Sequence, residues 1–236
     1  MIEIKSLVKI YEDGANAGVK AVNDISFNVE EGRFYTLLGP SGCGKTTTLR
    51  CIAGLEKANG GEILVAGKKV FSALDGTFVP AYRRPIGMVF QSYAIWPHMT
   101  VFENVAFPLR VGKQRLSHAE IQKKVSTALE QVELSDYGER MATQLSGGQQ
   151  QRLALARALA PRTELLIADD VSSALDVTTE LELWRALREH GVTVVGSTSK
   201  RAALSRADRV VVLIGGRAVA QGSWADLEDR YGHLAG

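Results

Sequence analysis

The sequence predicts an α/β fold with a mainly parallel sheet, an antiparallel β subdomain and an inserted α-helical subdomain. A glycine-rich run at residues 39–47 stands between a short apolar run and a segment with helical spacing, which gives the order strand, loop, helix. A second apolar run, residues 165–168, is typical of a parallel strand covered on both faces. Residues 2–11 and 20–29 instead alternate apolar and polar, as antiparallel strands do, whereas residues 92–160 show no convincing strand pattern.

The glycine-rich run has the composition and the context of a phosphate-binding loop, so the core is expected to be that of a P-loop NTPase. Its members are Gly39, Pro40, Ser41, Gly42, Cys43, Gly44, Lys45, Thr46 and Thr47. Glycines let the backbone turn its N–H groups inward, and the helix that begins near Lys45 adds its positive end at the same point. Lys45 is expected to reach the β- and γ-phosphates of ATP, and the Thr46 hydroxyl to ligate Mg²⁺. A chance glycine-rich turn is the alternative, and the flanking strand and helix disfavour it.

Composition and charge exclude several kinds of partner. The 236 residues carry a net charge of +2 with mixed signs throughout, and without a basic stripe nucleic acid is a poor candidate as the main partner. No apolar run approaches the roughly 18 residues of a spanning helix, and the first five residues alternate like a strand rather than a signal peptide. Cys43 and Cys51 are expected to point apart, which indicates reduced thiols and a cytosolic protein.

Two aromatic features leave alternatives open. Tyr11 ends the first antiparallel strand, where its ring could stack on a purine base or could be an ordinary edge tyrosine. Residues 92–100 carry large apolar groups without helical or strand period, so they are either core or a docking surface. Helical patterns follow at residues 101–110 and 117–132, and the second of them opens with a capping box.

A second anion site is predicted where a strong helix-forming segment, residues 153–160, is preceded by a serine and two glycines. Ser146 is expected to be the N-cap, and the glycines leave the N–H groups of the first helical turn accessible. The residues of this site are Ser146, Gly147, Gly148 and Gln149. One chain rarely needs two such sites, so this one is expected to face the nucleotide of another chain, with a plain helix cap as the alternative.

Two carboxylates follow the apolar run 165–168, at the carboxyl edge of a parallel sheet, where ligands bind. Asp169 is expected to hold Mg²⁺ through water, and Asp170 to face the attacking water. Without a phosphate loop, the same pair would be interpreted as caps of the next turn. The elements expected after this pair are a helix from Thr179, strands at residues 192–195 and 209–214, and a hairpin arm with a terminal helix at residues 217–236.

With these motifs in order along the chain, the sequence resembles the nucleotide-binding subunit of ATP-binding cassette (ABC) transporters over its whole length. The matching motifs are Tyr11 as the adenine-stacking aromatic, residues 39–46 as Walker A, Gln91 as the Q-loop, residues 145–149 as the signature, Asp169 as the Walker B acid and Asp176 as the aspartate of the loop between subunits. The resemblance implies that Gln91 acts in catalysis and in holding Mg²⁺. It also implies a single ABC ATPase domain, with a catalytic core and β subdomain in residues 1–91 and 161–236 and a helical subdomain in residues 92–160.

The resemblance further implies the partners and the location. A second nucleotide-binding subunit, in a homodimer or a heterodimer, encloses two ATP molecules with the first, and the closing and reopening of this pair drives transmembrane permease subunits. The chain is accordingly expected to be cytoplasmic and peripheral on the inner face of the cell membrane. Residues 93–99 and the helix after them are expected to receive a short permease helix. The first two-thirds look like importers of the iron, polyamine and sugar group, and the last third like a branch with degenerate catalytic sites.

Two departures from the family pattern weaken the expected hydrolysis. The family usually has glutamate where this chain has Asp170, and a carboxylate one methylene shorter retreats by about 1.5 Å from the water it should polarise. The family's switch histidine aligns with Ser199, which can donate a hydrogen bond to the γ-phosphate but carries no charge. The chain is therefore expected to be an ATPase with intact Mg-ATP binding and slow turnover. The alternatives are a dimerisation module that binds ATP with little turnover, and a soluble cassette protein that acts on DNA or ribosomes.

Overall fold

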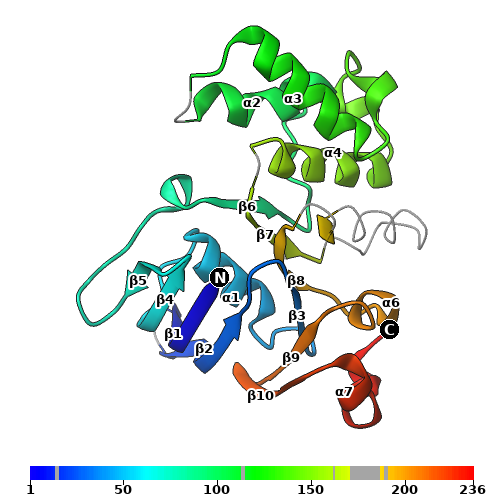
Figure 1. Cartoon of the computed structure of the whole chain (residues 1–236). Helices are drawn as coiled ribbons and strands as arrows, with labels where there is room; N and C mark the ends of the chain where they lie inside the picture. Colours follow the sequence, from blue (N-terminus) through cyan, green and yellow to red (C-terminus); the bar gives the residue numbers. More distant parts are fainter. Residues whose placement is uncertain (14–15, 113–114, 162, 171–186, 189–190) are drawn as a thin grey trace.

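The computed structural model of the chain describes residues 1–13, 16–112, 115–161, 163–170, 187–188 and 191–236, and its strands form two sheets (Figure 1). The strands are β1 (Ile2–Asp13), β2 (Asn16–Val29), β3 (Phe34–Leu38), β4 (Gly60–Val65), β5 (Lys68–Ser72), β6 (Ile86–Val89), β7 (Leu165–Asp169), β8 (Thr193–Ser197), β9 (Arg209–Ile214) and β10 (Arg217–Gly222). The helices are α1 (Lys45–Ala53), α2 (Val101–Val111), α3 (His118–Glu130), α4 (Gly147–Leu159), α6 (Arg201–Leu204) and α7 (Trp224–Tyr231). Short 3₁₀ turns lie at Ala81–Arg83, Ser135–Tyr137, Ala142–Gln144 and Gly232–Leu234.

The larger sheet has the strand order β10-β9-β3-β8-β7-β6. Strand β3 pairs in parallel with β8 and β9, and β7 pairs in parallel with β8 and β6, while β10 is antiparallel to β9. Every residue of β3 and β7 is buried, as expected for apolar strands covered on both faces. The smaller sheet, β2-β1-β4-β5, is antiparallel. The predicted α/β fold, with its mainly parallel and antiparallel sheets, is confirmed.

Two features of the smaller sheet differ from the sequence prediction. The pattern predicts no strand at Lys68–Ser72, yet β5 forms there, because Val70 and Phe71 are buried while the two lysines remain exposed on the edge of the sheet. The first hairpin is also longer than expected, since the pairing of Asp13 with Asn16 extends the ladder into the stretch that the sequence indicates as a connection. At the other end of the chain, β10 and α7 form the predicted hairpin arm and terminal helix.

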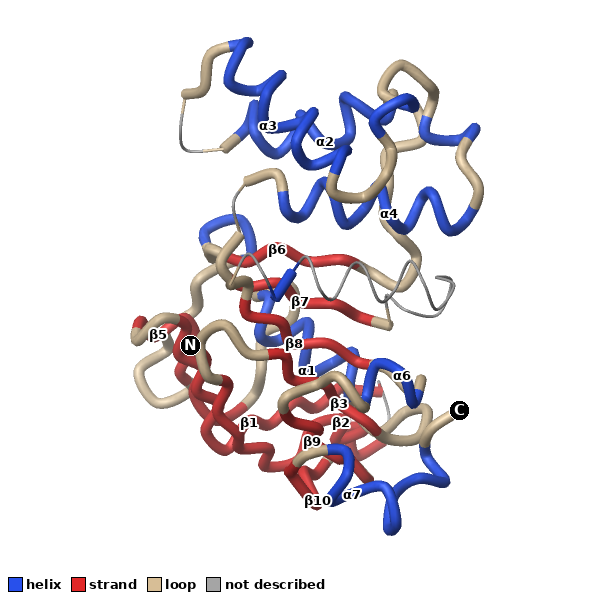
Figure 2. Tube along the Cα trace, turned by 45° about the vertical axis from the view of Figure 1, so that its right-hand side comes forward, coloured by secondary structure: helices blue, strands red, loops and turns tan. Residues whose placement is uncertain are grey.

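The strand-poor segment folds into helices α2, α3 and α4, which lie together at one end of the molecule beside β6 (Figure 1). Figure 2 shows the same grouping from a second direction. A complete capping box opens α2 at Thr100 and Glu103, and another opens α3 at Ser117 and Glu120, as the sequence predicts for the second. In the described part of the chain, no helix is both long enough and apolar enough to cross a bilayer.

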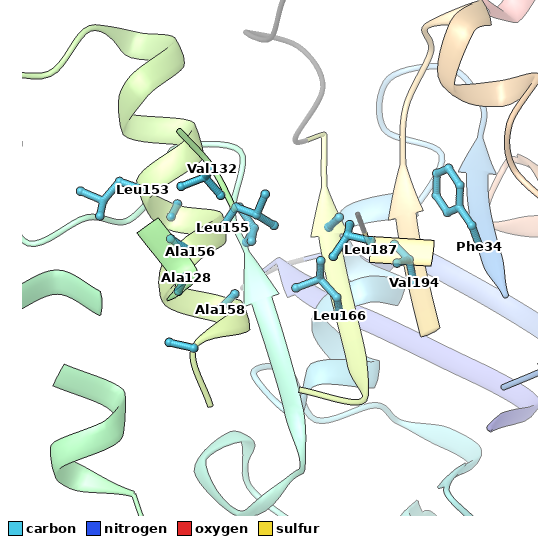
Figure 3. Close-up of a cluster of buried hydrophobic side chains, with 14 of the residues drawn as sticks. Phe34, Ala128, Val132, Leu153, Leu155, Ala156, Ala158, Leu166, Leu187 and Val194 are labelled. Atoms are coloured by element: carbon cyan, nitrogen blue, oxygen red, sulfur yellow. The ribbon is translucent and has the colours of Figure 1, made fainter. Parts of the chain in front are cut away.

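One buried cluster joins these helices to the parallel sheet. Figure 3 shows Leu155 and Ala158 of α4 on the side of that helix where Leu166 of β7 and Val194 of β8 lie. Phe34, at the start of β3, belongs to the same cluster. Leu155 and Ala158 thus pack the second half of α4 against the parallel sheet.

A buried arginine fixes the other end of the helix that follows the glycine-rich loop. The Arg84 guanidinium donates hydrogen bonds to the carbonyl oxygens of Cys51 and Ile52 at the end of α1, at 2.9 and 2.6 Å. It also donates to the carbonyl oxygens of Val70 on β5 and Val79, at 3.3 and 2.7 Å. Burial lowers the pKa of Arg84 to about 10. The C-terminal carbonyls of α1 are thereby capped by a cation, which fixes α1 against the smaller sheet.

Candidate nucleotide site

The glycine-rich loop joins β3 to α1 along a path that requires glycine at two positions. Gly44 is the N-cap of α1 with a φ of 101°, and a Cβ there would lie 2.3 Å from the carbonyl oxygen of Ala21 on β2. A Cβ on Gly39 would lie 2.1 Å from the carbonyl oxygen of Leu213 on β9. The loop is therefore wedged between β2 and β9 at the N-terminal end of α1, where backbone N–H groups attract anions.

The side chain of Lys45 folds back over this loop. Its Nζ donates hydrogen bonds to the carbonyl oxygens of Gly39, at 2.6 Å, and Pro40, at 3.1 Å. These bonds hold a lysine ammonium beside the N-terminal end of α1, so the loop combines the two positive groups that bind phosphate. The exposed residues of the loop are Pro40, Ser41 and Gly42; Lys45, Thr46 and Thr47 are half-buried, and Cys43 is buried.

A hydroxyl of the loop meets the first carboxylate at the end of β7. Asp169 Oδ1 accepts hydrogen bonds from Thr46 Oγ1, at 3.0 Å, and from Ser197 Oγ, at 2.9 Å. Asp169 is almost fully buried, and it pairs with Ser197 across β7 and β8. Hydroxyl and carboxylate oxygens are ligands that Mg²⁺ prefers, so this donor set fits a magnesium ion that also contacts bound phosphates.

The second carboxylate lies in a left-handed backbone conformation. Asp170 has a φ of 51°, and its N–H donates to Ser197 Oγ at 3.0 Å and to the Ser197 carbonyl oxygen at 3.2 Å. Asp170 Oδ2 accepts a long hydrogen bond of 3.4 Å from Gln91 Nε2, which brings the residue after β6 into the same site. Burial and the neighbouring Asp169 raise the pKa of Asp170, while Lys45 and Lys200 oppose this shift. Asp170 therefore retains a proton to higher pH than an ordinary aspartate does.

Two residues of this site are missed by the sequence prediction. Ser197 bonds both Asp169 and the backbone of Asp170, although nothing in its local sequence distinguishes it from the serines and threonines that follow. Lys200 lies near enough to Asp170 for its charge to act on the pKa of that carboxyl. Both depend on the parallel pairing of β7 with β8, which joins segments 28 residues apart and is not readable from either segment alone.

Ser199 lies on the loop that leaves β8 at the same edge of the sheet. Its side chain is exposed, and its carbonyl oxygen accepts a hydrogen bond of 2.8 Å from the N–H of Gly236. The buried neighbour Thr198 accepts a hydrogen bond on Oγ1 from the N–H of Lys200, at 3.1 Å, which makes a tight turn just before α6. The hydroxyl of Ser199 is thus available to solvent at the edge where Asp169 and Asp170 lie.

Tyr11 lies on the first hairpin, close along the strands to the residues that touch the loop. It pairs with Val19, two residues before Ala21, whose carbonyl oxygen abuts Gly44. The ring is 37% exposed, and Lys9 Nζ lies 4.9 Å from its centroid. An exposed aromatic ring in this place is suited to stacking on a planar ligand.

The helix cap expected at the second predicted anion site is present, and it is separate from the loop. Ser146 caps α4, since its Oγ accepts from the N–H of Gln149 at 3.3 Å, and Gln149 Oε1 accepts from the N–H of Ser146 at 3.0 Å. Ser146 and Gly147 are exposed, and Gly148 is half-buried. In both general views α4 lies on the opposite side of β6 and β7 from α1 (Figures 1 and 2). Asp176 and the helix expected from Thr179 lie outside the described residues.

The fold and the loop define a P-loop nucleotide-binding protein. Comparisons with known proteins identify the family within that class. The family model for the ABC transporter matches residues 22–173. A spermidine/putrescine import ATP-binding protein, PotA, from Mannheimia succiniciproducens is 41% identical over 239 aligned residues, which include 99% of this chain and 61% of that protein. The chain thus spans about three fifths of the length of this relative.

Solved structures agree with the sequence comparisons. A bacterial ABC transporter cassette, solved as a dimer, superposes with a TM-score of 0.85 at 32% identity, over 94% of this chain and 98% of that one. The same cassette in a post-hydrolysis dimer bound to ADP and Pi gives a TM-score of 0.85 at 31% identity over the same shares. The chain belongs to the ABC transporter family. Its resemblance to a nucleotide-binding subunit of that family, and to the importer group, is confirmed.

Proposed function

We propose that the chain binds Mg-ATP between its glycine-rich loop and the carboxylates at the end of β7, and couples this binding to transport. The observation that carries the proposal is the convergence of Lys45, Thr46 and Asp169. A lysine ammonium, a hydroxyl and a carboxylate meet at the N-terminal end of α1, with Thr46 Oγ1 only 3.0 Å from Asp169 Oδ1. A site with this composition suits a triphosphate and a divalent cation together.

The roles of the individual residues follow from their positions. Lys45 neutralises the β- and γ-phosphates, and Thr46, Asp169 and Gln91 hold Mg²⁺, which supplies charge neutralisation on the phosphates when bound. Asp170 orients and polarises the attacking water, and Ser199 donates to the γ-phosphate. The ring of Tyr11 stacks on the adenine, and the N–H groups of the loop, from Gly39 to Thr47, cradle the phosphates. Because Asp170 is short and Ser199 carries no charge, turnover is slow.

Two copies of the chain, or this chain and a related subunit, are proposed to close over two ATP molecules. The first turn of α4 begins with the exposed residues Ser146 and Gly147, carries an N-terminal helix end, and lies away from the loop of its own chain. A site that binds anions but cannot reach its own chain's loop suits a γ-phosphate held by a partner. The structural relatives were solved as dimers, and one of them contains ADP and Pi.

We expect the purified chain to form dimers with Mg-ATP and to remain monomeric with Mg-ADP. Replacement of Ser146 by Arg places a bulky side chain at the start of α4, so the Ser146→Arg variant should bind ATP normally but fail to dimerise. Analytical ultracentrifugation with each nucleotide measures this. Ser205→Arg, on an exposed position after α6, is a matched control that should dimerise like the wild type. Equal dimerisation of the Ser146→Arg variant would refute the proposed contact.

A second candidate function is a nucleotide-gated dimerisation module, and the pair Asp170 and Ser199 favours it over a fast ATPase. The two functions are separated by a comparison of ATP affinity with steady-state turnover. Micromolar binding with measurable turnover supports the transport ATPase. The same binding with no turnover, in the chain alone and in the presence of its partner subunits, supports the module.

We also propose where the permease contacts the chain. A groove of about 440 Å³ runs along the edge strand β6 and under the segment that follows Gln91; its lining includes Ile86, Met88, Trp96, Pro108 and Arg157. The groove is open and partly apolar, which suits the short helix of a membrane subunit. Docking there places the chain on the cytoplasmic face of the membrane, and the names of the relatives favour import as the direction.

Replacement of Met88 by Glu introduces a charge into this groove, and we expect it to abolish association with the permease while ATP affinity stays unchanged. The measurement is the fraction of the chain that sediments with membranes containing its permease subunits. Tyr82→Glu is the matched control, because Tyr82 is 78% exposed and lies outside the groove. Equal sedimentation of both variants and the wild type would exclude the groove as the docking site.

A further inference from the structure

The segment that follows Gln91 has a strained backbone. Tyr93 and Ala94 have φ values of 62° and 46°, in the left-handed region that residues with a Cβ rarely adopt. Two consecutive residues of this kind persist only where the surrounding structure holds them. The segment lies between the residue that reaches Asp170 and the groove lined by Trp96.

A buried arginine of α4 holds these two residues. Arg157 Nη1 donates a hydrogen bond of 2.6 Å to the carbonyl oxygen of Ala94, and Nη2 donates one of 3.0 Å to the carbonyl oxygen of Tyr93. Its guanidinium carbon lies 4.7 Å from the centroid of the Trp96 ring, and the residue is only 8% exposed. One planar guanidinium thus binds the carbonyl oxygens of two consecutive strained residues and the face of the Trp96 ring.

Tyr93 also reaches the opposite end of the same helix. Its hydroxyl lies 3.9 Å from the position that a Cβ on Gly147 would take, in the first turn of α4. The backbone of Tyr93 is therefore attached to the last turn of α4 through Arg157, while its side chain extends toward the first turn, where the second anion site is predicted. The carbonyl oxygens of the strained segment are thus fixed to α4, which itself packs into the core shared with β7, while the N–H of Tyr93 donates to the carbonyl oxygen of Phe90 just after β6, at 2.9 Å.

We infer that Arg157 is a positioning residue, which keeps the strained Tyr93–Ala94 segment in place so that Gln91 reaches Asp170 and Trp96 forms the wall of the groove. This inference rests on the proposed function, because it assigns Arg157 to the same ATP site. Arg157 touches neither the loop nor the carboxylates; it acts through the backbone that carries Gln91.

The experiment compares two arginines on one helix. Arg152 lies five residues before Arg157 on α4 and bonds Val132 and Glu133 instead, at 3.4 and 3.0 Å. In the purified chain, Arg157→Met should lower kcat by about 10-fold or more, because a displaced Gln91 no longer supports the site, with the Kd for ATP within about 3-fold of the wild type. Arg152→Met should leave kcat within about 2-fold. Arg157→Lys, which cannot bind both carbonyls with one rigid group, should fall between them.

A second substitution tests the strain itself. Glycine adopts positive φ without a steric cost, so Ala94→Gly removes part of the need for the arginine. It should restore most of the kcat lost by Arg157→Met but change the wild-type kcat by less than about 2-fold. The thermal unfolding midpoint should show the same coupling, with a smaller loss from Arg157→Met in the Ala94→Gly background. The inference is wrong if Arg157→Met behaves like Arg152→Met, or if Ala94→Gly has the same effect in both backgrounds.

Failure of the proposed function gives a different result. If the wild type binds no ATP, the proposed function is wrong; if it binds ATP without turnover, kcat cannot be compared between variants. In both cases the coupling between Arg157 and Ala94 in thermal unfolding alone decides the inference. If Arg157→Met lowers the unfolding midpoint less in the Ala94→Gly background than in the wild type, Arg157 is the residue that holds the segment. If the effects of the two substitutions on the midpoint are additive, the inference is overturned.

Discussion

Replacement of Lys45 by Met should weaken Mg-ATP binding by about 100-fold or more, since charge-assisted contacts to a triphosphate are lost while the length of the side chain is kept. The wild-type ammonium lies over the loop, bonded to the carbonyl oxygens of Gly39 and Pro40, next to the N-terminal end of α1. Without it, only the helix end, the loop N–H groups and the magnesium ion oppose the charge of the phosphates. The measurement is the dissociation constant by isothermal titration calorimetry.

The control for this substitution is Lys57→Met. Lys57 is exposed, and its ammonium lies 6.0 Å from the ring of Phe78, away from the loop. The Lys57→Met substitution removes one positive charge, as Lys45→Met does, so an effect of net charge alone appears in both variants. If Lys57→Met and Lys45→Met weakened ATP binding equally, the loop would not be the binding site.

Replacement of Asp170 by Glu together with Ser199 by His should raise ATP turnover, and leave ATP affinity nearly unchanged. A positioned general base contributes roughly 10² to 10⁴ in rate, so a gain of about 100-fold is expected from restoring the longer carboxylate and a ring that can carry charge. Binding is unaffected, because Lys45, Thr46 and Asp169 remain. The measurement is steady-state phosphate release at saturating ATP.

Two observations from the structure sharpen this prediction. The φ of Asp170 is 51°, a conformation that aspartate tolerates better than glutamate, so Asp170→Glu alone is expected to lower the thermal unfolding midpoint slightly. The restored activity must therefore be measured well below that midpoint. Gln91→Ala in the double variant should cancel most of the gain, since Gln91 Nε2 contacts the carboxylate at position 170. A wild-type rate equal to that of the double variant would contradict the account of slow hydrolysis.

Much of this site can be predicted from the sequence, because it depends on short-range patterns along the chain. The glycine-rich loop is recognised because the turn into α1 requires a positive φ at Gly44, which glycine adopts without steric cost. The cap at Ser146 is recognised because the hydroxyl of an N-cap and the amide of the residue three positions later bond each other. Each feature involves residues that are close in sequence.

The residues that the sequence does not reveal act over long distances in the chain. Ser197 reaches Asp169 through strand pairing between β7 and β8, and Arg157 reaches Tyr93 and Ala94 from 64 and 63 residues away. Strand β5 is missed for a related reason. Its two lysines leave only a short apolar pair, which is too weak a pattern to predict a strand, and the segment becomes a strand through its pairing with β4. Such contacts are set by tertiary packing, which single-segment patterns do not contain.

Calorimetric titration of the purified wild-type chain with ATP, with and without magnesium, tests the central claim most directly. Saturable heat at one site per chain is expected when ATP is added in the presence of magnesium. Weaker binding of ATP is expected when magnesium is chelated. Heat that is absent in the wild type under conditions where the chain is folded, or heat that is undiminished in the Lys45→Met variant, would contradict the assignment of this loop and these carboxylates as the ATP site.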